Sequence, residues 1–150
     1  MFKKILVTLD GSEFAERALE PALALARQFE AELVLLRVVV PEEVVITTPG
    51  LGAIYYDVKE TQSQRDYEEA EGYLYSLKTR WLGAELNVRS QVLSGAPPEV
   101  ILDVAEAENA DLIVMSTHGR SGFSRLLYGS VAEAVLRGAE KPVLLVPIKD

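Results

Sequence analysis

The sequence predicts a single α/β domain in which a parallel sheet carries helices on both faces. Three observations predict it: short apolar runs rich in β-branched residues, segments with helical spacing between them, and regular alternation of the two along 150 residues. Runs that are apolar throughout are typical of strands covered on both faces, and strand–helix–strand units connect by right-handed crossovers. A chain of this length is one domain, so residues 1–150 are taken as one unit.

Five apolar runs are the predicted strands. In chain order they are KKILVTL (3–9), AELVLLRVVV (31–40), ELNVRSQVL (85–93), ADLIVMS (110–116) and KPVLLVPI (141–148). Four segments between them are the predicted helices.

The first two helices are predicted from apolar residues that recur on one face. The first face holds Phe14, Ala18, Ala22, Leu25, Ala26 and Phe29, and the second holds Tyr67, Leu74, Leu77 and Trp81. Pro21 lies inside the first segment, where proline costs about 3 kcal/mol or forces a kink. We expect a kinked helix, with a break near Glu20 as the lesser alternative.

The last two helices are predicted from their end signals. The third, over 97–109, starts with Pro97 and Pro98, which suit a first helical turn. The fourth, over 130–138, has Ser130 at the expected N-cap and Gly138 where a left-handed C-terminal residue belongs. Residues 41–60 fit neither element and predict a long connection, either a functional lid or a disordered crossover.

Composition excludes several classes of function. The net charge of −8 argues against broad binding to nucleic-acid backbones or anionic membranes, which rests on Lys and Arg. The chain has no cysteine, so disulfides, thiolate catalysis and cysteine metal sites are absent. No apolar run approaches the ~18 residues of a membrane span, and the opening run is too short for a signal peptide. We therefore expect a soluble, cytoplasmic protein.

The segment from Ser116 to Ser130, STHGRSGFSRLLYGS, is the candidate binding site. It follows a predicted strand, and ligands of open parallel sheets bind outside the carboxyl ends of the strands. Gly119 and Gly129 allow close backbone approach, the helix after Ser130 offers unpaired N–H groups, and Arg120 adds positive charge. A phosphate cradle and a plain loop with turn glycines and a capping serine both fit this pattern.

Other motifs of nucleotide chemistry are missing from the sequence. There is no GxxxxGK[ST], and no GxGxxG opens a helix after a strand, so neither a P-loop nor a dinucleotide site is predicted. No Ser/His/Asp set has a defensible geometry. His118 is the single histidine, and a lone loop histidine is more often a bystander than a titrating group.

The chain resembles the universal stress proteins, whose ATP-binding members carry the motif Gly-x2-Gly-x9-Gly-Ser/Thr. Here Ser116, Gly119, Gly129 and Ser130 stand at its positions, with serine in place of the first glycine. KKILVTLDGSE, SGAPPEVIL and KPVLLVP extend the resemblance over the whole chain. It implies a Rossmann-like fold, of the adenine nucleotide alpha hydrolase-like type, with a five-stranded sheet in the order 3-2-1-4-5.

The resemblance also implies roles for individual residues. Asp10 matches an acidic residue near the adenosine, although Asp10-x-x-Glu13 also resembles a capping box. Val38, or Val39 or Val40, matches the strand end whose backbone reads the adenine edge. The remaining matches are Met115 beside the base, Gly119, Gly129, Ser130 and Val131 in the phosphate loop, and Thr8 where some ATP-binding relatives have proline.

The function implied by the resemblance is that of a stress-response regulatory protein that binds ATP with little or no turnover. Any Mg²⁺ would be held mainly by the phosphates. The alternatives are a slow ATPase or phosphotransferase, and an interaction module that has lost its nucleotide site. The last strand, Pro142 to Ile148, would be a sheet edge, and the resemblance implies a homodimer through its antiparallel pairing.

Overall fold

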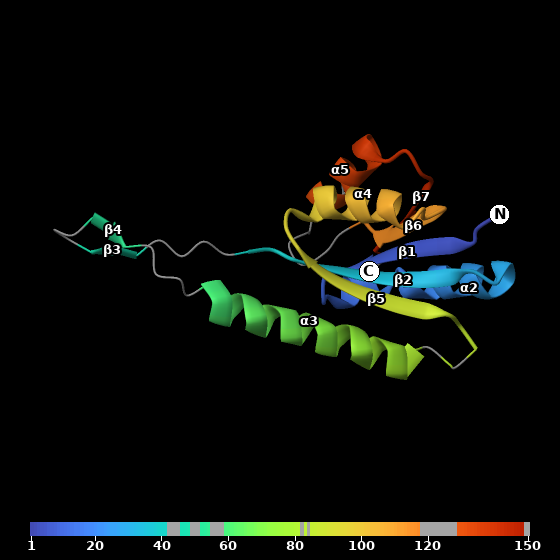
Figure 1. Ribbon diagram of the computed structural model, residues 1–150. Coiled ribbons are helices and arrows are strands. Elements are labelled where there is room, and N and C mark those ends of the chain that lie inside the picture. Colours follow the sequence, from blue (N-terminus) through green and yellow to red (C-terminus); the bar gives the residue numbers. More distant parts are fainter. Residues whose placement is uncertain are drawn as a thin grey trace.

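Five parallel strands form the central sheet of the protein, in the order β5-β2-β1-β6-β7 (Figure 1). The computed structural model describes residues 1–41, 46–48, 52–54, 59–81, 83, 85–117 and 129–148, with the side chains of 46–62 left out. The strands are β1 (Lys4–Leu9), β2 (Glu32–Val39), β5 (Val88–Ser94), β6 (Leu112–Ser116) and β7 (Val143–Val146). Counted within this sheet, the order is 3-2-1-4-5, which confirms the predicted doubly wound fold.

Helices cover both faces of this sheet (Figure 1). The helices α1 (Glu13–Glu16), α2 (Leu19–Phe29) and α3 (Lys59–Trp81) pack on one face, and α4 (Pro97–Ala107) and α5 (Ser130–Gly138) pack on the other. A hydrophobic core lies on each face of the sheet, and alternate side chains of β1 pack into them. Ile5 and Val7 pack into the core under α1, α2 and α3, and Leu6 packs into the core under α4 and α5. The apolar runs therefore form strands that are buried on both sides.

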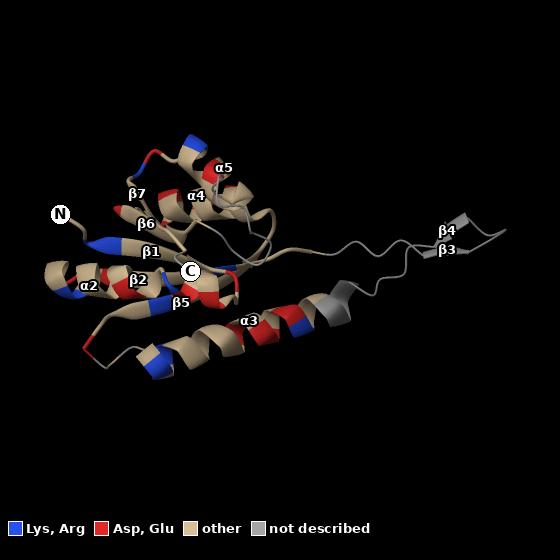
Figure 2. Ribbon diagram, turned by 180° about the vertical axis from the view of Figure 1, so that it is seen from behind, with Lys and Arg blue, Asp and Glu red and all other residues tan. Residues whose placement is uncertain are grey.

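The long helix α3 is only narrowly amphipathic. Of the predicted face, Leu74 and Leu77 are buried, whereas Trp81 is 47% exposed. The outward face is acidic, with Glu68, Glu69 and Glu71 exposed; Figure 2 shows acidic residues in red along the ribbon of this helix. Ala70, Leu74 and Leu77 therefore anchor α3 to the sheet.

The segment around Pro21 forms two helices, as in the lesser alternative, rather than one kinked helix. The break lies at Arg17 and Ala18, a turn before the proline, and Ala18 N donates to Ala15 O at 3.1 Å. Pro21 then sits in the first turn of α2, where a missing N–H costs little because that group lacks a helical partner.

The predicted range of α5, 130–138, is correct, but the predicted caps at its two ends are wrong. Gly129, not Ser130, is the N-cap, and Ser130 is the first helical residue. Gly138 is the last helical residue and is not among the described glycines with positive φ. A Cβ on Gly138 would lie 2.6 Å from Leu102 Cδ1, so glycine there allows α4 and α5 to pack closely.

The connection predicted over 41–60 contains two short strands, β3 (Ile46–Thr48) and β4 (Gly52–Ile54), which pair antiparallel in a sheet of their own. Residues 42–45, 49–51 and 55–58 lie outside the described residues, and with them the choice between lid and crossover. Within the described part of the chain, no helix is long and apolar enough to cross a membrane.

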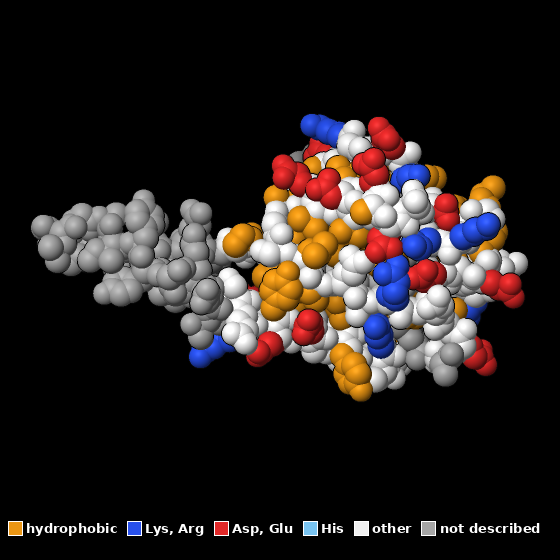
Figure 3. Space-filling model, viewed as in Figure 1, with side chains coloured by type: hydrophobic (Ala, Val, Ile, Leu, Met, Phe, Trp, Pro, Cys, Tyr) orange, Lys and Arg blue, Asp and Glu red, His pale blue; other side chains and the backbone are white. Residues whose placement is uncertain are grey.

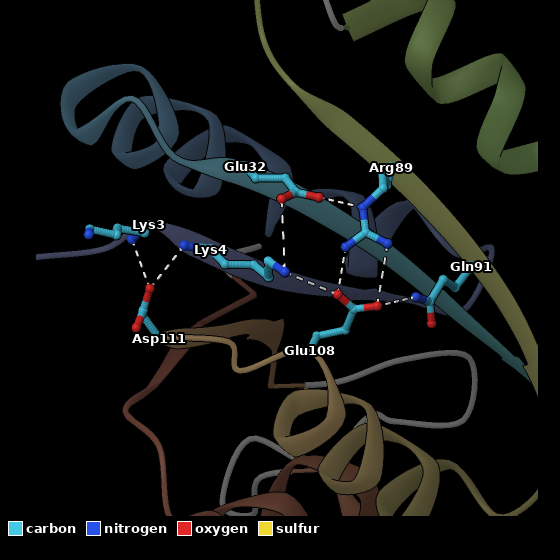
Figure 4. Close-up of polar contacts among 7 residues, drawn as sticks. All are labelled: Lys3, Lys4, Glu32, Arg89, Gln91, Glu108 and Asp111. Carbon is cyan, nitrogen blue, oxygen red and sulfur yellow. Dashed lines mark hydrogen bonds and ion pairs between the residues drawn. The ribbon is translucent and has the colours of Figure 1, made fainter.

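A network of polar side chains links the strands of the sheet near their amino ends (Figure 4). Arg89 of β5 donates to Glu32 of β2 and, at 2.5 Å, to Glu108 at the end of α4. Gln91 and Lys4 also donate to Glu108, at 2.6 and 3.2 Å. We call these five residues the amino-edge network.

Candidate functional site

The carboxyl ends of β1, β2 and β6 lie side by side at the end of the sheet opposite the amino-edge network. We call this end the carboxyl edge. Val7 pairs with Val114, so Asp10 and Thr117 each stand three residues beyond that pair, and Leu9 pairs with Arg37. After β1 the chain turns to α1 on one face, and the segment after β6 leads to α5 on the other. This divergence makes β1 and β6 the topological switch point, where open α/β sheets bind ligands.

The turn after β1 is held together by Asp10. Its Oδ1 accepts hydrogen bonds from Ser12 N at 2.9 Å and from Ser12 Oγ at 2.5 Å. Ser12 is the N-cap of α1, since its Oγ accepts from Ala15 N at 3.1 Å. The capping-box interpretation of Asp10 is therefore wrong: Asp10 lies before the cap and orients it.

Beneath this turn lies Arg37 of β2, a residue that the sequence analysis missed. It is 8% exposed, and among the described residues it is the only charged one that is buried. Gly11 has φ +87°, and a Cβ on it would lie 2.7 Å from Arg37 Nη1 and 3.0 Å from Cζ. The available signal was a lone arginine within the apolar run LVLLRVVV.

Tyr73 of α3 lies on the other side of Arg37. The guanidinium carbon is 5.0 Å from the ring centroid, within the range of a cation–π contact. The Tyr73 hydroxyl donates to Glu16 Oε1 of α1 at 3.0 Å. Burial, and secondarily the hydrogen bond to Glu16, raise the pKa of Tyr73 well above its usual range. The tyrosine therefore stays a neutral donor that ties α3 to α1.

The end of β6 and the start of α5 meet through backbone hydrogen bonds. Gly129 N donates to Thr117 O at 2.6 Å, and Thr117 N donates to Val146 O at 3.1 Å. Gly129 has φ −54° and ψ 153°, and no side chain caps the helix. The first turn of α5 is therefore fixed at the carboxyl edge of β6, with helical N–H groups that a ligand can use.

The other predicted site residues occupy the same edge, except those outside the described residues. Met115 and Ser116 are buried at the end of β6, Val38 is half-buried at the end of β2, and Thr8 is half-buried in β1. Val131 is half-buried in the first turn of α5, and Ser130 is exposed. His118, Gly119 and Arg120 lie outside the described residues.

The predicted adenine-reading backbone at the end of β2 is partly engaged within the protein. Val39 O accepts a hydrogen bond from Gly95 N at 3.0 Å. Figure 3 shows hydrophobic side chains gathered where β2 and β5 end beside α4. Val40 and Leu93 are the exposed apolar residues of those strand ends, at 56% and 37%. An apolar surface thus borders the candidate site.

Within the described part of the chain, no group of three His, Cys, Asp or Glu side chains is arranged to hold a metal ion. Asp10 is an acidic residue of the candidate site, and its Oδ1 accepts hydrogen bonds from Ser12.

The fold is a doubly wound α/β domain, and the candidate site lies at its switch point. The family model of the universal stress protein family matches residues 1–147, and the chain belongs to this family. Universal stress protein MJ0531 of Methanocaldococcus jannaschii is 34% identical over 97% of this chain and 82% of its own length.

Solved structures of the family have the same fold. That of MJ0577, from the same organism, has a TM-score of 0.85 at 31% identity and covers 100% of this chain and 99% of its own. UspA of Lactobacillus plantarum has a TM-score of 0.75 at 25% identity, covering 97% of both chains. A universal stress protein in complex with cAMP, at 24% identity and a TM-score of 0.63, with 97% of both chains covered, is a likeness of fold alone.

Proposed function

We propose that this universal stress protein is a regulatory module that binds ATP at the carboxyl edge of its sheet, with little or no turnover. The observation that carries the proposal is the hydrogen bond from Gly129 N to Thr117 O, at 2.6 Å. It fixes the N-terminus of α5 beside the strand ends from which Asp10 projects. A site with a polar turn at one side and helical N–H donors at the other suits a nucleoside phosphate.

The phosphate end of the ligand would lie against the first turn of α5. That helix has nine residues and no side-chain cap, so its first N–H groups and its dipole favour an anion. A local anion site is needed because the whole chain carries a net charge of −8, which repels ATP at long range. Gly119 of the sequence motif would complete the cradle.

The nucleoside end would lie between the ends of β1 and β2. There Asp10 would face the ribose, Met115 would line the base, and the backbone near Val38 would read the adenine edge. Gly95 N already occupies the Val39 carbonyl, so the backbone of Val38 or Val40 is the better candidate. ATP is abundant in the cytoplasm, where the proposal places the protein.

Calorimetric titration of Mg-ATP into the wild type and Gly129→Val tests the site. The backbone at Gly129 is extended, a conformation that valine adopts readily, so the variant should fold. Its side chain would stand where a phosphate belongs, and binding should be lost. Equal affinity in the two proteins would show that the start of α5 does not hold the phosphates. Multiple turnovers of ATP by the wild type would favour the slow ATPase instead.

Ser130→Ala is the milder variant at the same helix. Losing a hydroxyl contact to a charged group costs about 1.5–3 kcal/mol, or roughly ten- to a hundredfold in affinity. Because Ser130 is exposed and is not the N-cap, the free energy of unfolding of the variant should differ from that of the wild type by less than about 0.5 kcal/mol. A fall in affinity at unchanged stability would therefore report the ligand contact.

The oligomeric form that we propose is a homodimer through β7, one of the two edge strands of the central sheet. All four of its residues are half-buried, and both faces pack only partly against the cores. An apolar edge of this kind favours pairing with another strand, and pairing with its own copy gives a two-fold contact. Sedimentation at tens of micromolar should give the dimer mass, and a monomer mass would refute the proposal.

A further inference from the structure

Arg37 is a buried cation that stands next to the candidate nucleoside site. The residue is 8% exposed, and no described carboxylate lies within ion-pair distance of its guanidinium. Burying a charge without a counter-ion is expensive, so its place in the fold needs a structural reason.

The guanidinium lies between the turn after β1 and the ring of Tyr73. A Cβ on Gly11 would lie 2.7, 3.0 and 3.1 Å from Nη1, Cζ and Nη2. Because these three distances are similar, the flat face of the guanidinium is turned toward Gly11. Its carbon is 5.0 Å from the centroid of the Tyr73 ring. A planar, weakly hydrated cation is suited to such stacking, and the ring partly compensates its desolvation.

The turn that Arg37 supports is the one that carries Asp10. Gly11 has φ +87°, a conformation that glycine adopts without steric cost, and the missing side chain lets the turn lie directly against the guanidinium. Asp10 then accepts from Ser12, and Ser12 accepts from Ala15 N, which starts α1. A shift of Gly11 would move the Asp10 carboxylate together with the cap of α1.

We infer that Arg37 is a positioning residue for nucleoside binding: stacked on Tyr73, it holds the Gly11 turn so that Asp10 faces the ribose. The inference rests on the proposed function. It assigns Arg37 to the nucleoside end alone, since the guanidinium contacts the turn after β1, and the phosphate end lies at the start of α5. The base and sugar should therefore depend on Arg37, and the phosphates should not.

Calorimetry with two ligand fragments, adenosine and tripolyphosphate, separates the two ends of the site. Arg37→Met keeps an unbranched stem of similar length and removes the charged plane. This variant should lower the affinity for adenosine about tenfold or more. Displacing a positioned group by ~1 Å can cost up to about a hundredfold. Tripolyphosphate affinity should stay within about twofold, as for sites that do not interact.

Two further variants check that the effect comes from the stack. Tyr73→Leu removes the ring that supports the guanidinium, and it should lower the affinity for adenosine. Combined with Arg37→Met it should cause no further loss, because both substitutions act through one contact. Arg89→Met is the matched control: it removes a strand arginine from the neighbouring strand β5, at the amino edge. It should leave adenosine affinity within about twofold.

Hydrogen exchange of the free protein tests the route through the turn. In Arg37→Met the amides of Ser12 and Ala15, which donate to Asp10 and Ser12, should exchange faster. Unchanged exchange, unchanged adenosine affinity, or equal loss of both fragments would overturn the positioning role while leaving ATP binding by the wild type intact. A wild type that binds neither adenosine nor ATP would sink the proposed function itself.

Discussion

The two edges of the central sheet use polar residues in different ways. At the amino edge, side chains of opposite charge are paired with one another, and Glu108 alone accepts from Arg89, Gln91 and Lys4. At the carboxyl edge, hydrogen bonds within the backbone and the Asp10–Ser12 turn fix the geometry, and the buried Arg37 has no described carboxylate partner. The pairing at the first edge stabilises the fold, whereas the second edge is the one at which we propose that donors and acceptors meet a ligand.

The electrostatic state of the amino edge follows from this pairing. The hydrogen bonds from Arg89, before all others, lower the pKa of Glu108 to about 2. Backbone N–H groups of Lys3 and Lys4 likewise lower the pKa of Asp111 below its usual range. Both carboxylates are therefore ionised at neutral pH and contribute to folding stability there.

The largest effect on stability should come from Gly11→Ala at the carboxyl edge. A side chain at φ +87° costs about 1–2 kcal/mol, and displacing the packed guanidinium adds about 1–3 kcal/mol. The free energy of unfolding in urea should fall by about 2–5 kcal/mol in total.

The control for that variant is Gly72→Ala. Gly72 lies in α3, and a Cβ there would meet nothing within 4 Å. Replacing a helical glycine with alanine should raise stability by about 0.5–1 kcal/mol. If Gly11→Ala were as stable as the wild type, the turn would not be held by the close contact with Arg37.

Most of the fold could be predicted because its signals are local. The five apolar runs and the helical spacings between them depend on neighbouring residues, and they gave the correct strands and sheet class. The break before α2 was harder to place, because Arg17 and Ala18 both keep helical backbone angles, and only the hydrogen bonding changes there. Proline marked a break but not its exact residue.

The site was predicted less well, because its features depend on contacts between distant segments. Ser12 and Asp10 both fit an N-cap by residue type, and the fold selects Ser12. Gly138 was taken for a C-cap, whereas its close approach to Leu102 belongs to helix packing. Arg37 meets Gly11 and Tyr73 from 26 and 36 residues away, and no local pattern announces such a contact.

A smaller effect on stability is expected from Glu108→Gln at the amino edge. The substitution removes the charge that Arg89 and Lys4 share, and the free energy of unfolding at pH 7 should fall by about 1–2 kcal/mol. The pKa shift alone would suggest more, but Arg89 is 44% exposed and solvent screens the pair.

The pH dependence of that variant follows from the direction of the shift. The pKa of Glu108 falls from 4.5 to about 2 on folding, so its contribution is fully present above about pH 4.5. It is lost as the pH falls toward 2. Urea titrations at pH 7, 5 and 3 should show a difference between wild type and variant that is constant at first and then shrinks. A difference that grew at pH 3 would contradict the assignment.

The smallest effect is expected from Glu133→Gln, which breaks an ion pair outside both edges. Arg137 donates to Glu133 at 2.7 Å, four residues away on α5, and this distance lies between the 2.5 and 3.2 Å of the donors to Glu108. The side chains are 79% and 45% exposed, however, and no described residue adds a second bond to this carboxylate. Exposed pairs at this spacing contribute about 0.3–0.5 kcal/mol, and 0.5 M salt should remove that contribution. If Glu133→Gln destabilised the protein as much as Glu108→Gln, a single ion pair would account for the stability that Glu108 contributes. The several donors that converge on the half-buried Glu108 carboxylate would then give no additional stability.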